Sequence, residues 1–218
     1  MYHYQYILFD LDGTITDPAE GITTCVRHAL HCQGVEEENY QNLCRLIGPP
    51  LAEGFQEFYG FDEARAWEAV GQFRELFARI GVEKNIPYTG IREALARLKD
   101  AGLTLCVATS KPEEFAQKII RRFELEKYFT LVGGASMDDT RSKKADVIAH
   151  VLRQLGAEDS ARVLMVGDRK HDVLGAAAFG IDCVGVLYGY GSQEELEMAG
   201  ARYIASTPGD IPRIVLGE

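Results

Sequence analysis

Two carboxylates, placed two residues apart, lie near the start of the chain. Asp10 and Asp12 lie at the end of the apolar run that begins at Tyr6, and Gly13 and Thr14 follow them. Residues two apart on a strand point to the same side, so both carboxylates can act on one substrate. The glycine suits a tight turn at which backbone approaches an anion. This pattern predicts a catalytic pair at the end of a buried strand.

Polar residues also follow later apolar runs. Thr109, Ser110 and Lys111 follow residues 103–108, and Lys143-Lys144 precede a helical pattern. The run Val163–Val166 leads into GDRKHD, which contains Asp168 and Asp172. The carboxyl ends of parallel strands share one edge of a sheet, so we expect all these side chains to meet there.

Such a meeting has an electrostatic consequence. The carboxylates of Asp10, Asp12, Asp168 and Asp172 would repel one another without a cation among them. Hard oxygen ligands with open positions suit Mg²⁺, which binds through a few carboxylates and substrate phosphate. The sequence therefore predicts a magnesium site at this edge.

The elements that must position these residues alternate between strands and helices. This alternation predicts an α/β core with a Rossmann-like parallel sheet covered on both faces. We expect strands at residues 6–11, 103–108, 129–132, 163–166 and 183–187, and a short one near 203–204. We expect helices at about 90–101, from 112 to 123, at 143–155, one ending at Phe179, and at 192–199.

One insertion interrupts this core. Apolar residues at helical spacing, separated by glycine and proline, predict about four helices over residues 17–85. Asp17 and Pro18 resemble an N-cap followed by proline at the first helical position. We therefore predict a core domain of residues 1–16 and 86–218 and a helical cap domain of residues 17–85.

Composition narrows the classes of partner. Hydrophobic residues make up 46% and charged residues 26%, as in ordinary globular proteins. The net charge of -10 argues against nucleic-acid binding. No apolar stretch suits a membrane span or a secretory signal, and the five cysteines read as reduced thiols. We expect a cytoplasmic enzyme, as a monomer or homodimer, and a small anionic metabolite as its partner.

Four stretches together resemble a known family. DLDGT at 10–14, the apolar run ending in Thr109, Lys144 before a helix, and GDRKHD at 167–172 are similar to the motifs of haloacid dehalogenase superfamily phosphatases. The insertion resembles the C1 type of cap in that family. The segments 47–51 (IGPPL) and 186–191 (VLYGYG) resemble phosphoglycolate phosphatase-like and 5′-nucleotidase-like members.

The resemblance implies a mechanism. Asp10 would attack phosphorus and form an aspartyl-phosphate, and Asp12 would protonate the leaving oxygen and later activate water. Gly13, Thr109, Ser110 and Lys144 would bind the phosphate. The resemblance also implies that Mg²⁺ is held by Asp10, the backbone carbonyl of Asp12 and Asp168. Asp172 would ligate it through water or orient Lys144.

Several residues have plainer interpretations. Of the two adjacent lysines, Lys144 directly precedes the helical pattern, so we choose it over Lys143 as the inward one. Thr109 could instead cap the helix that Pro112 opens. His171 reads as a solvated loop residue. We interpret the other candidates as surface arginines, Arg45 and Arg141, and as cap core aromatics, Phe55, Phe58, Tyr59 and Phe73.

Other functions remain open. A sugar-phosphate mutase would transfer phosphoryl groups with the same residues, and a non-catalytic protein would bind a ligand without turnover. The intact pair Asp10 and Asp12 argues against the second. Phosphonate cleavage needs a cap lysine in related proteins, and the only lysine of the predicted cap is Lys84, at its exit, which argues against this reaction. Phosphoglycolate, a nucleoside 5′-monophosphate and a sugar phosphate all remain possible substrates.

Overall fold

The computed structural model describes residues 3–138 and 140–218, and the chain divides into two compact units. One unit comprises Met1–Asp17 and Pro87–Glu218, and the other comprises Pro18–Ile86. The predicted division lies one residue away at each boundary. The assignment of these units as catalytic core and cap stays a prediction.

The first unit is built on a six-stranded sheet with strand order β5-β4-β1-β6-β7-β8. Every pairing within it is parallel. The central β1 pairs on both sides, so that Ile7 lies opposite Leu105 of β4 and Leu164 of β6. The strands are β1 (Tyr6–Phe9), β4 (Thr104–Pro112), β5 (Leu131–Ala135), β6 (Val163–Gly167), β7 (Asp182–Val186) and β8 (Tyr203–Ala205).

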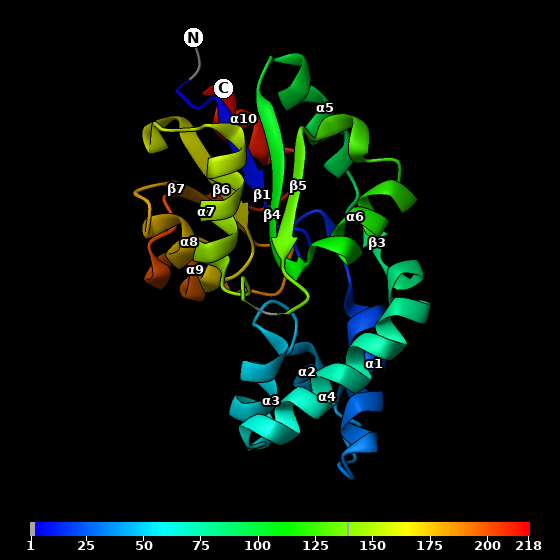
Figure 1. The fold of residues 1–218 in the computed structure, drawn as a ribbon. Helices are drawn as coiled ribbons and strands as arrows, with labels where there is room; N and C mark the ends of the chain where they lie inside the picture. The colour runs from blue at the N-terminus through cyan, green and yellow to red at the C-terminus, as the bar shows by residue number, and fades with distance from the viewer. Residues whose placement is uncertain (1–2, 139) are drawn as a thin grey trace. The chain divides into compact units, whose positions relative to one another are not determined.

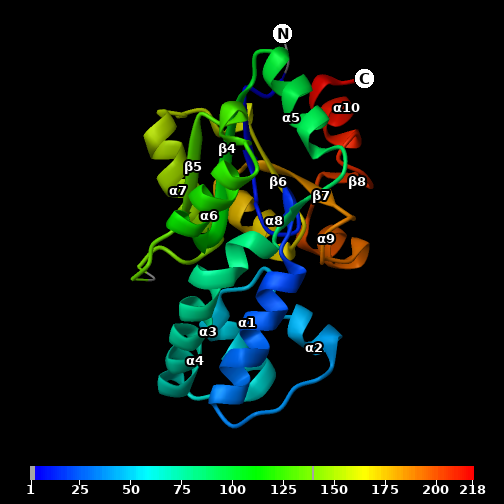
Figure 2. The same cartoon turned by 90° about the vertical axis from the view of Figure 1, so that its right-hand side faces the viewer.

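Helices cover both faces of this sheet, which explains why its inner strands are apolar throughout. Figure 1 shows α7, α8 and α9 on one side of the sheet and α5 and α6 on the other. Figure 2 shows α5 and α10 side by side near the chain ends. The helices are α5 (Ile91–Asp100), α6 (Glu113–Arg122), α7 (Lys144–Leu155), α8 (Lys170–Ala177), α9 (Gln193–Ala199) and α10 (Asp210–Leu216).

Side chains alternate between the two faces of the strands. Leu8 points to the face that α7 and α8 cover, where it joins Cys106, Val147 and Met165 in one fully buried cluster. Its neighbours Ile7 and Phe9 are also fully buried, as expected for a strand in the middle of a parallel sheet. This packing holds β1 in place and thereby sets the position of Asp10, which follows its last residue.

The second unit is helical. It contains α1 (Ala19–Cys32), α2 (Tyr40–Cys44), α3 (Leu51–Tyr59) and α4 (Glu63–Leu76), followed by a π-helix (Phe77–Gly81) and a 3-10 helix (Val82–Lys84). Of the predicted aromatic core, Phe55 and Phe73 are buried, whereas Phe58 and Tyr59 are only half-buried. The short β2 (Thr16–Asp17) and β3 (Ile86–Pro87) pair as a separate two-stranded sheet.

Two expectations about elements were wrong, and one helix was missed. Asp17 does not cap α1: it lies in β2, its carboxylate accepts a hydrogen bond from the Tyr190 hydroxyl, and α1 follows Pro18. β5 begins at Leu131 rather than 129 and extends through two glycines, which carry no strand signal. The short helix α10 was not predicted.

No helix within residues 3–138 and 140–218 is both long and apolar enough to cross a membrane.

Candidate active site

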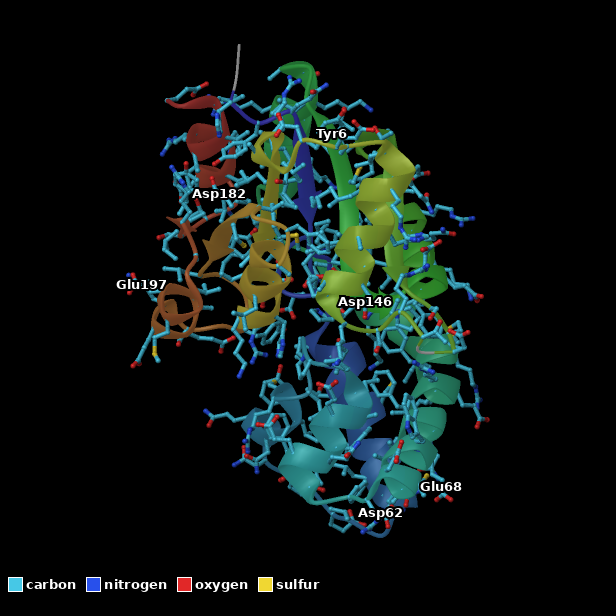
Figure 3. All side chains as sticks on the ribbon, turned by 60° about the vertical axis from the view of Figure 1, so that its left-hand side comes forward. Tyr6, Asp62, Glu68, Asp146, Asp182 and Glu197 are labelled. Atoms are coloured by element: carbon cyan, nitrogen blue, oxygen red, sulfur yellow. The ribbon has the colours of Figure 1, made fainter. Side chains whose placement is uncertain are left out.

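The candidate site lies at the carboxyl ends of the central strands. Asp10 directly follows β1, and its N–H donates to the Val166 carbonyl of β6 at 2.9 Å, which extends the ladder by one step. Asp168 directly follows β6. In Figure 3, Tyr6 marks the start of β1 and Asp146 marks the first turn of α7 at the opposite end of the sheet. The predicted residues therefore share one edge.

Three carboxylates meet there. Asp10, Asp168 and Asp172 each offer an oxygen within 4.8 Å of the others, and all three residues are buried. Asp172 lies in the first turn of α8, where one carboxylate oxygen accepts the Arg169 N–H at 3.0 Å. It does not lie on a solvated helix face. The sheet and the start of α8 thus hold three carboxylates close together.

Lys144, the first residue of α7, supplies a cation to two of them. Its ammonium lies 2.7 Å from Asp10 Oδ1 and 2.8 Å from Asp172 Oδ1, and it donates to the Ala108 carbonyl at 3.0 Å. Burial alone would lower the pKa of Lys144, but the two carboxylates outweigh burial and raise this pKa above its usual range. Lys143, by contrast, is exposed. The structure therefore turns Lys144 inward, as we expected.

Asp168 forms no ion pair with a lysine or arginine among the described residues. One oxygen, Oδ2, accepts the Tyr190 N–H at 2.8 Å, whereas Oδ1 is buried without a hydrogen-bond partner among the described residues. Burial, and then the charges of Asp172 and Asp10, raise the pKa of Asp168 well above its usual value. The negative charge of the Asp168 carboxylate is therefore only partly compensated by its surroundings.

The balance of charge at these carboxylates indicates whether they could bind a metal ion. Among the described residues, the acidic group of Asp10, Asp168 and Asp172 has one ammonium for three carboxylates, and Asp168 Oδ1 has no hydrogen-bond partner. The pKa of Asp172 is also raised, to about 6, because burial outweighs the opposing effect of Lys144. A hard divalent cation with oxygen ligands would correct this imbalance. The donor set therefore fits Mg²⁺.

Asp12 is paired separately. Its Oδ2 accepts a 2.6 Å hydrogen bond from the ammonium of Lys111, at the end of β4. Burial raises the pKa of Asp12, and the charge of Lys111 opposes that shift. The sequence predicts Lys111 at this edge of the sheet but does not predict its pairing with Asp12. The available signal was a lone basic residue directly after the predicted phosphate-binding pair Thr109-Ser110.

Gly13 forms the tight turn that we expected after Asp12, and its role in phosphate binding stays a prediction. Its N–H donates to the Thr16 carbonyl at 2.8 Å, so this arrangement does not offer that N–H to a phosphate. Its φ of +85° is a left-handed conformation, and a Cβ there would lie 2.1 Å from Asp168 Oδ2. Glycine is needed at this turn because Asp168 packs directly against its backbone.

The two predicted phosphate-binding residues Thr109 and Ser110 lie in β4. Thr109 is buried in β4, where its hydroxyl accepts the Lys111 N–H at 3.2 Å, and it is not the cap of α6, which is Pro112. Ser110 is half-buried next to it.

Two surface interpretations were wrong. Arg141 is half-buried and donates to the Gly134 carbonyl and the Glu113 carboxylate. His171 lies within α8, and burial lowers its pKa. Arg45, in the second unit, stacks its guanidinium over the Phe58 ring at 4.0 Å.

Carboxylates and a lysine at the carboxyl edge of a parallel sheet point to a class of hydrolase. Comparison with known proteins identifies the family. Residues 7–186 match the family of haloacid dehalogenase-like hydrolases. The chain belongs to this family.

Individual relatives give further detail. A 5′-nucleotidase of Pseudomonas aeruginosa is 49% identical over 193 residues, covering 88% of this chain and 87% of the relative. A tyrosine-protein kinase of Mycobacterium tuberculosis, PtkA, is 43% identical over 193 residues, covering 88% of this chain but 65% of the kinase. The crystal structure of a predicted phosphatase from Clostridium acetobutylicum superposes with a TM-score of 0.96 at 42% identity, covering 99% of both chains. The predicted family, fold class and enzyme class, a phosphatase of this family, are therefore confirmed.

Proposed function

We propose that the protein hydrolyses a small phosphomonoester through an aspartyl-phosphate, with Mg²⁺ as its cofactor. One observation carries the proposal: the buried carboxylates of Asp10, Asp168 and Asp172 meet at the carboxyl edge of the sheet, where the ammonium of Lys144 pairs with Asp10 and Asp172. A purely structural cluster would have no reason to bury an excess of negative charge. A phosphoryl-transfer site needs that arrangement to hold a cation and a phosphate together.

The catalytic pair has complementary positions. Asp10 is held to the end of the sheet by its own N–H and carries the nucleophilic oxygen. Asp12 keeps its Oδ1 free of hydrogen bonds to the described residues, so that oxygen is available to exchange a proton. It protonates the leaving oxygen and then takes a proton from the water that hydrolyses the aspartyl-phosphate. Thr109, Ser110 and Lys144 bind the phosphate oxygens.

The metal ligands follow from the same geometry. Asp10 and Asp168 would hold Mg²⁺, together with the backbone carbonyl of Asp12 that the family resemblance implies. When bound, Mg²⁺ neutralises charge on the phosphoryl group under attack. Asp172 orients Lys144, because its Oδ1 lies 2.8 Å from that ammonium.

For the substrate we propose a nucleoside 5′-monophosphate, with phosphoglycolate as the alternative. The 49% identity to a 5′-nucleotidase along most of both chains supports this choice. The acidic net charge of -10 supports a small metabolite rather than a nucleic acid as partner. A cytoplasmic location belongs to the same proposal, and cell fractionation tests it.

A second candidate is phosphoryl transfer to a protein tyrosine, favoured by the 43% identity to a protein named tyrosine kinase. The two candidates differ in the acceptor of the phosphoryl group, which is water in one and a phenol in the other. A radiolabelled ATP assay with a tyrosine-containing protein separates them.

The test is phosphate release from a panel of nucleoside 5′-monophosphates, phosphoglycolate, sugar phosphates and a phosphotyrosine peptide. We expect turnover with Mg²⁺, none with EDTA, and the highest kcat/KM for a nucleoside monophosphate. Absence of phosphate release from every panel member, with labelled tyrosine formed from ATP, would replace the proposal by the second candidate.

A further inference from the structure

Lys111 is the second lysine at the site, and its contact differs from that of Lys144. Its ammonium donates to Asp12 Oδ2 at 2.6 Å, and the two side chains are only 5% and 12% exposed. An ammonium and a carboxylate lose hydration when they are buried, so such a pair persists only where geometry favours it.

The end of β4 is shaped to bring Lys111 to this position. Ala108 pairs with Gly133 of β5, but the next pair is Pro112 with Ala135. Residues 109–111 therefore face Gly134 alone, which is a bulge in β4. Bulges re-aim side chains at the ends of strands.

Two hydrogen bonds brace the bulge. The Thr109 hydroxyl accepts the Lys111 N–H at 3.2 Å, and the Glu113 carboxylate accepts the Gly134 N–H at 3.2 Å. A Cβ on Gly134 would lie 2.6 Å from the Lys111 carbonyl oxygen, so the strands approach as closely as a glycine permits. The backbone that carries Lys111 is therefore held on both sides.

The pairing makes the two oxygens of Asp12 different. Oδ2 is held by Lys111, whereas Oδ1 is buried with no hydrogen-bond partner in the described part of the chain. We propose that Lys111 is a positioning residue, which fixes the Asp12 carboxyl so that Oδ1 exchanges the proton with the leaving oxygen. This inference rests on the proposed function, because it assigns how Asp12 performs its step.

The step balances as follows. As an oxygen of Asp10 bonds to phosphorus, the bond from phosphorus to the leaving oxygen breaks and its electron pair stays on that oxygen. The proton on Asp12 Oδ1 moves to this oxygen, and an alcohol leaves. An alkoxide needs that proton to leave, whereas nitrophenolate is a weak base that needs it little.

The test compares two esters. Lys111→Met and Lys111→Arg are assayed with p-nitrophenyl phosphate and with a nucleoside 5′-monophosphate, whose leaving group is an alcohol. The parameter is kcat/KM, which covers the steps up to departure of the leaving group. Lys118→Met, on the exposed side of α6, is the matched control.

We expect Lys111→Met to lower kcat/KM for the nucleotide at least about 10-fold more than for the aryl ester, through lower kcat. Lys111→Arg retains the charge with different geometry, so it should show the same selective loss to a smaller extent. It also serves as the test if Lys111→Met does not fold. The control Lys118→Met should leave kcat/KM unchanged for both substrates.

Two results would overturn the inference while leaving the proposed function intact. An equal loss for both esters would assign Lys111 a merely structural role, and a rise in KM at constant kcat would make it a substrate ligand. Wild-type protein that released phosphate from neither ester would instead overturn the proposed function, and this inference with it.

Discussion

Lys144 shows how much of the site depends on single side chains. Its ammonium forms ion pairs with Asp10 and Asp172 and donates one hydrogen bond to the Ala108 carbonyl. The DxDGT and GDxxxD patterns and the lysine were visible in the sequence because each has a fixed residue type at a fixed spacing. The partner of Asp12 was not visible, because a bulge in β4 that no spacing encodes brings Lys111 to it.

Lys144→Met should lower kcat/KM by about 100-fold or more, because a fixed positive charge at the phosphate is lost. Lys143→Met is the matched control, since it changes the adjacent, exposed lysine. Steady-state kinetics on both variants checks this. Similar losses in the two would show that the lysine we chose is not the one that serves the site.

Gly13→Ala should destabilise the protein, and Gly34→Ala provides the reference. Both glycines have positive φ, +85° and +74°, but a Cβ meets Asp168 at Gly13 and nothing within 4 Å at Gly34. The left-handed backbone costs an alanine roughly 1–2 kcal/mol at either position. The clash should add about 1–3 kcal/mol at Gly13 only. Urea unfolding of both variants measures the difference, and equal losses would contradict the close approach to Asp168.

At the scale of elements, strand ends and helix starts do the positioning. The alternation of strands and helices predicted the order of the core, since apolar runs of parallel strands leave a clear signal. It missed the extension of β5 to Ala135, because Gly133 and Gly134 carry no strand propensity. It also missed the half-buried place of Arg141, because that depends on Glu113 and Gly134 from two other elements.

The contact between α7 and α8 can be tested with a pair of helical glycines. A Cβ at Gly175 in α8 would lie 2.7 Å from Lys144 Cγ, whereas one at Gly71 in α4 would meet nothing within 4 Å. Gly71→Ala should stabilise the protein by about 0.5–1 kcal/mol through helix propensity. Gly175→Ala should show no such gain and should lower kcat, because it displaces Lys144. Thermal unfolding and kinetics decide, and a stabilised, fully active Gly175→Ala would contradict this packing.

At the scale of the whole molecule, charge links the site to stability. The chain has a net charge of -10, and part of its excess negative charge is buried around Asp168. Composition predicted the sign of the field but not its concentration at one point, since burial is a property of the fold. Binding of a cation there should therefore stabilise the folded state.

Mg²⁺ at 100 times its Kd should stabilise the wild type by about 2.7 kcal/mol. Asp168→Asn should raise stability without metal, because it removes one of three buried carboxylates, and should abolish the gain from Mg²⁺. Urea unfolding of the wild type and of Asp168→Asn, each with EDTA and with Mg²⁺, gives the four free energies of unfolding to be compared. A variant that still gains the full stabilisation would show that Mg²⁺ binds elsewhere.

The central claim is that Asp10 is the nucleophile, and trapping its phosphorylated form tests this most directly. The enzyme would be mixed with substrate and Mg²⁺, quenched in acid within one turnover, digested, and analysed by mass spectrometry. We predict the added mass of one phosphoryl group on the peptide that contains Asp10, absent with EDTA and in Asp10→Asn. Full turnover by Asp10→Asn, or a phosphoryl group on another residue, would contradict the account.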